Sequence, residues 1–527
     1  MTGKKVFFKQ NILAEPLFNQ WYAWPYLIAP ASAAMYVANS HLKIMQSFVS
    51  APQVHVSALK NPALLGGPFI NYDPDKAPAI KQLIDKTLTE QKIMLELAEA
   101  IKTLDQMLVN EATGYSMEAL YSKVPDLLKG YVELVYDLHD NPSIRFLEGL
   151  FYKSKFYNTG SQSVSLSEMS GDSRSFVFST PRLESDGCLF LKTPFESDAL
   201  DELFRMKTTP QPLDYIKDAL RIAHESSGLF DTFFTENEPG QRRHFDGDGV
   251  RIRYLGHACI LIETGEVNLL IDPVVSYKYN SEVGRETFAD LPEKIDYVLI
   301  THAHQDHLMF ETLLQLRHKV RNIIVPRSVG GDQADPSAKL ILQTLGFCNV
   351  WDLDELEQVE IPGGYIMGCP FLGEHCDLNV RTKLAYYIHL LGRKVFAVAD
   401  SNNVESRLYQ HLREIIGEID VLFIGMECDG APMSWLYGPL LTKPLARKND
   451  QSRRFDGSTC EKGMAIIDIL KPKQVYVYAM GQEPWCSFLT SIRYTEDSRP
   501  IVESNRLVAE CLSRGLMAER LYGCKTV

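Results

Sequence analysis

The chain has 527 residues, of which 45% are hydrophobic, so its length predicts at least two domains with separate cores. The formal net charge is -13 at pH 7, and lysines and arginines form no cluster, which excludes a nucleic-acid-binding surface from the expected functions. No run of about 18 apolar residues occurs, so we expect a cytoplasmic protein without a membrane partner.

The first half of the chain has an α+β pattern. Apolar side chains recur near a 3.6-residue period in residues 79–108, which predicts an amphipathic helix. Residues 125–138 and 213–224 predict two more helices, and residues 175–179 and 188–192 are short β-rich runs that predict strands. No catalytic spacing is present in this half.

A polar, glycine-rich stretch at residues 236–249 separates the first half from a different pattern. We therefore expect an α+β N-terminal domain at residues 1–245 and a second domain at residues 246–527. In the second domain short apolar strands alternate with turns and helices, as in a sandwich of two sheets with helices outside. The expected strands cover residues 251–255, 258–263, 268–271, 297–301, 322–325, 394–399 and 421–425, and a helix covers residues 309–316.

The strand expected at residues 297–301 is followed at once by His302, His304, Asp306 and His307. Alternate residues of an extended chain point the same way, so the first two imidazoles can converge on one ion. The chain then turns, which lets the aspartate and the last histidine reach a second ion about 4 Å away. Because four such groups would otherwise need separate partners at the end of an apolar strand, we interpret the motif as a two-metal site.

This motif, preceded by Gly256-His257 and by Asp272-Pro273, resembles the metallo-β-lactamase superfamily. The resemblance covers residues from about 250 to the end and implies an αββα metallo-β-lactamase sandwich. We interpret His257 as a hydrogen-bonded structural histidine, and Asp272 as a turn-former that supports the metal loops from behind. The resemblance alone does not choose between hydrolases and iron-dependent oxygenases.

The hydrolases of that superfamily have a third histidine, a bridging aspartate and a late histidine as further ligands. Asp400 closes the strand at residues 394–399, where its two oxygens can bridge two cations. Glu374 and His375 occupy the third position, and because neighbouring side chains of an extended segment diverge, the sequence leaves open which one reaches the site. Met480 and Gly481 stand where the late histidine is expected. Glu427 ends the strand at residues 421–425 and is either a further carboxylate of the site or a solvent-exposed strand end.

Carboxylates at Asp306, Glu374 and Asp400 make this site richer in oxygen donors than a zinc hydrolase site, and such donors fit iron or manganese better than zinc. With the long N-terminal α+β region, the chain therefore resembles the diiron β-hydroxylase family of chloramphenicol biosynthesis. That resemblance implies two iron ions in an oxo- or hydroxo-bridged cluster. It implies that they are held by His302, His304, Asp306, His307, Glu374 and Asp400, with Glu374, Asp400 and Glu427 as catalytic residues.

The resemblance also implies a function. The protein would be an O2-dependent non-haem diiron monooxygenase that hydroxylates the β-carbon of an aminoacyl group held as a phosphopantetheine thioester on the carrier (thiolation) domain of a nonribosomal peptide synthetase. Its electrons would come from an external reductant, and its N-terminal domain would cover the cluster and help to receive the carrier. Whether the chain forms a homodimer through that domain is left open. The alternatives are a dinuclear zinc hydrolase of a thioester, lactone or phosphodiester, and a binding protein whose metals only stabilise the fold.

Overall fold

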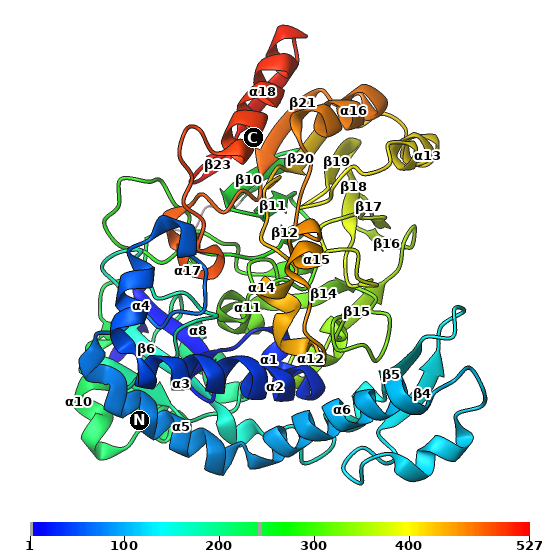
Figure 1. Ribbon diagram of the computed structural model, residues 1–527. Coiled ribbons are helices and arrows are strands. Elements are labelled where there is room, and N and C mark those ends of the chain that lie inside the picture. The colour runs from blue at the N-terminus through cyan, green and yellow to red at the C-terminus, as the bar shows by residue number, and fades with distance from the viewer. Residues whose placement is uncertain (1–3, 241–244) are drawn as a thin grey trace.

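The computed structural model describes residues 4–240 and 245–527. Two seven-stranded sheets form the centre of its C-terminal half (Figure 1). In order across the first sheet the strands are β15 (Val350–Leu353), β14 (Val320–Pro326), β13 (Ile295–Leu299), β12 (Asn268–Ile271), β11 (Cys259–Glu263), β10 (Arg251–Gly256) and β23 (Lys525–Thr526). Across the second they are β16 (Gln358–Ile361), β17 (Gly364–Cys369), β18 (Ala385–Leu390), β19 (Arg393–Ala397), β20 (Val421–Gly425), β21 (Gln474–Tyr478) and β22 (Met517–Arg520).

The two sheets pack face to face through fully buried side chains such as Ile260 and Ile271 from one sheet and Tyr386 and Phe423 from the other. Helices cover both outer faces. The first sheet is covered by α11 (Phe310–Leu316) and α12 (Ala338–Thr344), and the second by α13 (Arg407–Ile416), α16 (Cys460–Leu470) and α18 (Arg499–Ser513). This layering confirms the predicted αββα sandwich, and each of the seven strands predicted in this half is present.

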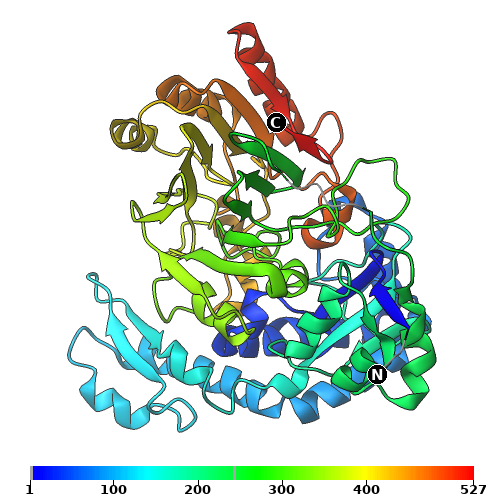
Figure 2. The ribbon, with the colours of Figure 1, turned by 180° about the vertical axis from the view of Figure 1, so that it is seen from behind.

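The N-terminal region is α+β, as predicted, and lies below the sandwich in Figures 1 and 2. A four-stranded sheet in the order β3-β2-β6-β7 contains the strands β3 (Trp21–Tyr22), β2 (Ile12–Phe18), β6 (Gln162–Glu168) and β7 (Cys188–Leu191). Three helices of this region pack together, with α5 (Ala77–Glu90) in contact with both α3 (Leu42–Ser50) and α6 (Lys92–Glu111). The division at residue 245 stays a prediction, because residues 241–244 of the expected linker lie outside the described residues.

Three local predictions in this region were wrong. The helix expected at residues 79–108 is two helices, α5 and α6, because Gln91 leaves helical geometry and its side chain donates a hydrogen bond to Ser161. Residues 125–138 contain no α-helix but turns and a strand, β4 (Val132–Tyr136), which pairs with β5 (Pro142–Phe146). Residues 175–179 form turns rather than a strand, and Val177 donates its backbone hydrogen bond to Phe488.

A buried ion cluster joins the N-terminal region to the sandwich. Arg174 lies 2.6 Å from Glu15 of β2 and 2.6 Å from Glu311 of α11, and Arg182 lies 2.9 Å from Glu15. Burial alone would raise the pKa of Glu15, but the attraction of the two guanidinium groups is the larger effect and lowers this pKa to about 2. Since α11 begins three residues after His307, the cluster fixes the helix that follows the predicted metal motif.

A buried lysine lies at the same interface. Lys207 is 2% exposed, and its ammonium group faces the rings of Phe8, Tyr277 and Phe288 at 5.3, 5.3 and 4.8 Å from their centroids. Burial lowers its pKa to about 7 from the ordinary value of 10.5. Between those two pH values the unfolded chain binds a proton that the folded protein does not, so this group destabilises the fold increasingly as pH falls from about 10.5 to about 7.

Replacing Lys207 with methionine should therefore raise the free energy of unfolding at pH 7. The expected net gain is on the order of 1–3 kcal/mol, because the loss of the cation–π contacts offsets part of the effect. Urea unfolding of the parent and of Lys207→Met at pH 7 and at about pH 9.5 measures the effect. The advantage of the variant should shrink at the higher pH. An advantage of equal size at both pH values would contradict a lowered lysine pKa.

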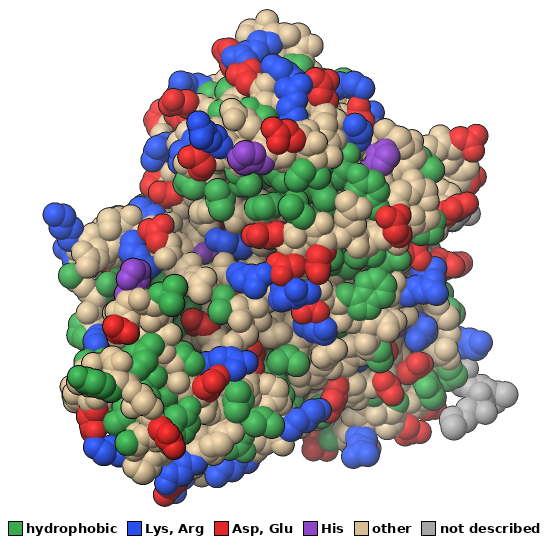
Figure 3. All heavy atoms as spheres, turned by 90° about the vertical axis from the view of Figure 1, so that its right-hand side faces the viewer, with side chains coloured by type: hydrophobic (Ala, Val, Ile, Leu, Met, Phe, Trp, Pro, Cys, Tyr) green, Lys and Arg blue, Asp and Glu red, His purple; other side chains and the backbone are tan. Residues whose placement is uncertain are grey.

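Charged side chains of both signs are mixed over the face shown in Figure 3, without a large area of one sign. In the described part of the chain no helix is both long and apolar enough to cross a membrane.

Candidate metal centre

The predicted ligands lie where the carboxyl ends of strands from both sheets meet. The parallel strands β12 and β13 end at residues 271 and 299, and β19 and β20 of the other sheet end at residues 397 and 425. His302 follows β13, and Asp400 follows β19. Parallel strands present their carboxyl ends at one edge, so residues about 100 positions apart in the sequence come within reach of one ion.

His302, His304 and Glu374 form one buried group of metal-ligand type. Nδ1 of His304 lies 2.7 Å from Oε1 of Glu374, and Nε2 of His302 lies 3.9 Å from the same oxygen. Burial opposes ionisation of Glu374, yet the surrounding imidazoles hold its pKa well below the ordinary value. The carboxylate is therefore charged and available to a cation at this position.

A second group contains His302, His307 and Asp400. Oδ2 of Asp400 lies 3.1 Å from Nε2 of His307 and 3.7 Å from Nε2 of His302. His302 belongs to both groups, so Asp400 stands beside the first group as well as within the second. This position suits the bridging role expected for Asp400 from the sequence.

Asp306 belongs to a third group with His307 and His257. Oδ2 of Asp306 lies 3.2 Å from Nε2 of His257, whose Nδ1 accepts a hydrogen bond from the backbone of Gly481. Burial opposes ionisation of Asp306, but the adjacent His307 and His257 hold its pKa well below the ordinary value. Three overlapping groups thus give one continuous cluster that contains all six predicted ligands.

Asp272 supports the cluster from behind. Its Oδ2 lies 2.8 Å from Nδ1 of His307, and its carboxylate accepts hydrogen bonds from the backbone and the hydroxyl of Thr301. A carboxylate on Nδ1 leaves Nε2 of His307 directed at Asp400 and fixes the orientation of the ring. Asp272 is fully buried, in agreement with the supporting position expected from the sequence.

The segment 373–376 directs Glu374 rather than His375 into the cluster. Gly373 has φ 74°, and a Cβ there would lie 2.5 Å from Cβ of Asn402, so only glycine fits. Glu374 itself has φ 63°, which turns its side chain toward His304. His375 belongs to none of the three groups; its Nδ1 lies 2.7 Å from Oε2 of Glu374.

Glu427 lies outside the three groups found among the described residues. Burial raises its pKa to about 8, and the nearby Asp400 adds to this shift. Its Oε2 atom is buried while the residue as a whole is half-buried, so Glu427 is a partly covered strand end rather than a fully exposed one. Its expected catalytic role stays a prediction.

The buried polar atoms of the cluster indicate that it is built for cations. Within residues 4–240 and 245–527, Nε2 of His302, Nε2 of His304 and Oδ1 of Asp400 have no hydrogen-bond partner. Unpaired buried imidazole nitrogens and carboxylate oxygens are costly unless a metal satisfies them. Three carboxylates and three imidazoles form a donor set that fits two iron ions.

The sequence interpretation missed His257 as a member of the cluster. It was set aside as a structural histidine, and the structure does show its hydrogen bond from Gly481, but its other ring nitrogen faces Asp306. The only sequence signal for His257 was the Gly256-His257 pair directly after a predicted strand. In the structure both of these residues have positive φ, which turns the chain there. Met480 and Gly481, which stand in place of the expected late histidine, bring their loop against His257 instead.

Fold and cluster together define a dinuclear metalloenzyme of the metallo-β-lactamase fold. The diiron non-heme beta-hydroxylase N-terminal domain matches residues 7–239, and a beta-lactamase superfamily domain matches residues 251–427. The 4-amino-L-phenylalanyl-(CmlP-peptidyl-carrier-protein) 3-hydroxylase of Streptomyces venezuelae is 37% identical over 529 residues, which cover 98% of this chain and 99% of that protein. The chain belongs to the diiron non-heme β-hydroxylase family.

A solved structure agrees over the full length. The crystal structure of CmlA, a diiron beta-hydroxylase from Streptomyces venezuelae, matches with a TM-score of 0.93 and 37% identity, and the match covers 100% of both chains. A metal-dependent hydrolase of Rhizobium johnstonii is 36% identical, but only over 59 residues, which are 11% of this chain and 24% of that protein. The family resemblance inferred from the sequence is confirmed, and with it the predicted class of non-haem diiron monooxygenase.

Proposed function

We propose that this protein hydroxylates the β-carbon of an aminoacyl group that is held as a thioester on the phosphopantetheine arm of a nonribosomal peptide synthetase carrier domain. The observation that carries the proposal is the similarity over 98% of the chain to a hydroxylase whose substrate is bound to a peptidyl carrier protein. The carboxylate-rich cluster supports the same chemistry, because it lacks the late histidine of the zinc hydrolases.

In this proposal His302, His304 and Glu374 would hold one iron, and Asp306, His307 and Asp400 would hold the other. When bound, the two ferrous ions supply electrons for the reduction of O2 that accompanies hydroxylation of a C–H bond. An external reductant restores these electrons after each turnover.

The protein's own side chains orient and shield this chemistry. Asp272 fixes the tautomer of His307 by accepting a hydrogen bond from its Nδ1–H, so that Nε2 is available as a ligand atom. Burial of His302 and His307, both fully covered, excludes bulk water from one side of the cluster. Glu427 provides an acidic group next to Asp400 rather than a further ligand.

The two parts of the chain have separate roles in the proposal. Residues 246–527 hold the cluster, and residues 1–245 cover it and receive the carrier domain. The contact of Arg174 with Glu311 of the sandwich supports this covering role. The reaction is placed in the cytoplasm, as expected from the sequence.

The test measures iron content and oxygen incorporation in the same sample. Purified protein should contain about two iron atoms per chain. After chemical reduction, exposure to ¹⁸O2 should add one labelled oxygen atom to a carrier-bound aminoacyl group, measured by mass spectrometry of the carrier. A panel of carriers loaded with different amino acids, including 4-aminophenylalanine, covers the substrates, and the same amino acids without a carrier are the control.

Zinc-loaded protein gives the decisive comparison. It should neither hydroxylate the carried group nor release it from the thioester. The zinc form is compared with the iron form by the rate of thioester hydrolysis without O2. If the zinc form hydrolysed the thioester at least as fast as the iron form, the hydrolase alternative would be favoured and the proposal would be wrong.

A further inference from the structure

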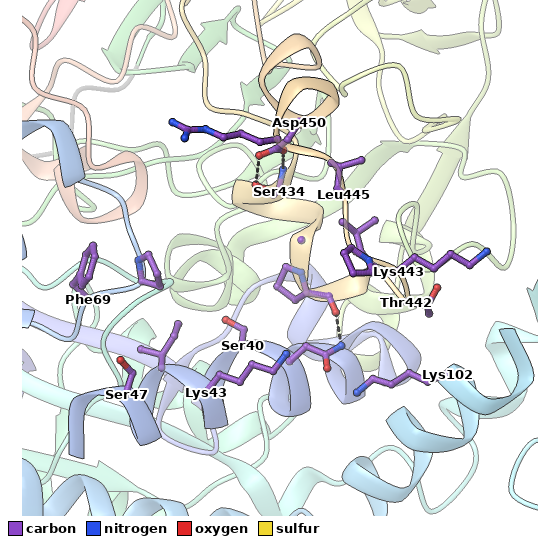
Figure 4. A pocket seen from close by; sticks show the side chains of 18 residues that line it. Ser40, Lys43, Ser47, Phe69, Lys102, Ser434, Thr442, Lys443, Leu445 and Asp450 are labelled. Atoms are coloured by element: carbon purple, nitrogen blue, oxygen red, sulfur yellow. Dashed lines mark hydrogen bonds between the residues drawn. The ribbon is translucent and has the colours of Figure 1, made fainter. Parts of the chain in front are cut away.

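A cavity of about 890 Å³ lies between the N-terminal helices and a loop of the second domain. Figure 4 shows that α3 and α6 form its floor, while the segment 434–450 forms its roof. Four cationic residues line it, Lys43, Lys102, Lys443 and Arg447, against one carboxylate, Asp450. This excess of positive charge contrasts with the chain's net charge of -13.

The two lysines on the floor converge. Lys43 from α3 and Lys102 from α6 extend toward each other in Figure 4, whereas Lys443 extends away from them. Within the described ranges, 4–240 and 245–527, neither Lys43 nor Lys102 makes an ion pair. Two ammonium groups that approach without a counter-ion repel each other, and an anion between them would relieve that repulsion.

The carboxylates around the cavity already bind neutral partners. Asp450 accepts hydrogen bonds from the backbone and the hydroxyl of Ser434, at 2.8 Å each. Asp105, one turn beyond Lys102 on α6, accepts the hydroxyl hydrogen of Thr442 at 2.7 Å. The cationic floor therefore stays available to a ligand from outside the chain.

An aromatic layer connects the cavity to the candidate metal centre. Ser434 on the cavity wall begins α14 (Ser434–Tyr437), whose Trp435 and Tyr437 rings lie 6.1 and 5.7 Å from the ring of Phe455. Phe455 lies 5.5 Å from the ring of His304. These ring contacts form a continuous apolar layer from the cavity wall to His304.

We propose that this cavity binds the phosphodiester of a phosphopantetheine arm through Lys43 and Lys102, so that the carried aminoacyl group extends along Trp435, Tyr437 and Phe455 toward His304. The inference rests on the proposed function and names the site at which the carrier's arm enters. Two converging ammonium groups in a cavity of this size suit a single phosphate, whereas a polyanion requires an extended basic surface. The apolar part of the arm matches the aromatic layer.

The experiment compares 4′-phosphopantetheine with pantetheine, which lacks the phosphate, by calorimetric titration of the iron-loaded protein. The parent should bind the phosphorylated compound at least about tenfold more tightly, the size expected for charge-assisted contacts, and this preference should weaken with added salt. In Lys43→Gln/Lys102→Gln the preference should disappear. The matched control Lys81→Gln/Lys92→Gln changes two lysines of α5 and α6 that make exposed ion pairs on the helix surface, and should keep the preference.

Turnover separates failure of this inference from failure of the proposed function. With a carrier-bound aminoacyl group, the pocket variant should raise KM about tenfold, with a smaller change in kcat. If the parent hydroxylates the carried group but the pocket variant keeps both its KM and its phosphate preference, the site is wrong and the function stands. Equal binding of the two compounds by the parent overturns the site directly. If the lysines bind phosphopantetheine but no carried group is hydroxylated, the site stands and the function is wrong.

Discussion

Glu374→Ala should lose iron and abolish hydroxylation. Glu374 is the only carboxylate in the group with His302 and His304 found among the described residues, and its removal leaves one ion with two imidazoles. We expect iron content to fall from about two atoms to about one per chain, and the rate of hydroxylation to fall by more than about a hundredfold. Elemental analysis and the ¹⁸O2 assay measure the two effects in one preparation.

Two further variants decide whether the effect is specific. Glu427→Ala removes a buried carboxylate that belongs to none of the described metal groups, so it should keep both iron atoms. His375→Ala removes a side chain that contacts Glu374, so it should weaken iron binding without removing a ligand. If His375→Ala lost an iron atom while Glu374→Ala kept two and remained active, the ligand assignment would be reversed and the hydrolase alternative strengthened.

The second large effect concerns stability. Arg174→Met should destabilise the protein by about 3–5 kcal/mol, because it leaves Glu311 buried beside Glu15 without its guanidinium partner. Among residues 4–240 and 245–527, only the hydroxyl of Tyr277 would still donate a hydrogen bond to the Glu311 carboxylate. The guanidinium also lies over the ring of Phe488, 3.3 Å from its centroid, so the substitution removes a cation–π contact as well. Thermal unfolding monitored by circular dichroism measures the loss.

Two control variants remove an exposed ion pair and both charges of the buried ion pair, respectively. Arg145→Met removes an exposed pair with Glu133, about half exposed on both sides, and should cost less than about 1 kcal/mol. Arg174→Met/Glu311→Leu removes both charges of the buried pair and leaves Glu15 with Arg182, so it should recover most of the lost stability. A single variant as stable as the parent, or a double variant no better than the single, would show that this cluster does not join the two regions.

The sequence predicted the sandwich well because its strands are short apolar runs bounded by turn residues. The strands β12 and β20 were predicted to the residue, and His302, His304, Asp306 and His307 follow β13 and lie in one cluster of metal-ligand type. Predictions were poorer in the N-terminal half. There, residues 125–138 have an apolar spacing compatible with a helix, and only the pairing of β4 with β5 shows that Val132 and Leu134 alternate inward as a strand does.

The candidate site was also predicted from the sequence only in part. Residue type and spacing indicated most of the cluster, because no apolar strand end needs so many imidazoles and carboxylates for structural reasons alone. The choice between Glu374 and His375 could not be made from sequence, since it depends on the left-handed backbone at Gly373 and Glu374. The place of His257 beside Asp306 was likewise hidden, because it depends on the contact between residues 257 and 481, which are distant in the sequence.

The sequence by itself indicated the chemistry of this protein: a set of candidate ligands rich in carboxylates, at the end of a strand. Tertiary structure alone decided which candidate ligands lie together, how Arg174 fixes the helix after the motif, and how Lys43 and Lys102 come to extend toward each other. The physical reason is that periodicity and spacing act over a few residues, whereas these contacts join strand ends and helices more than 50 positions apart.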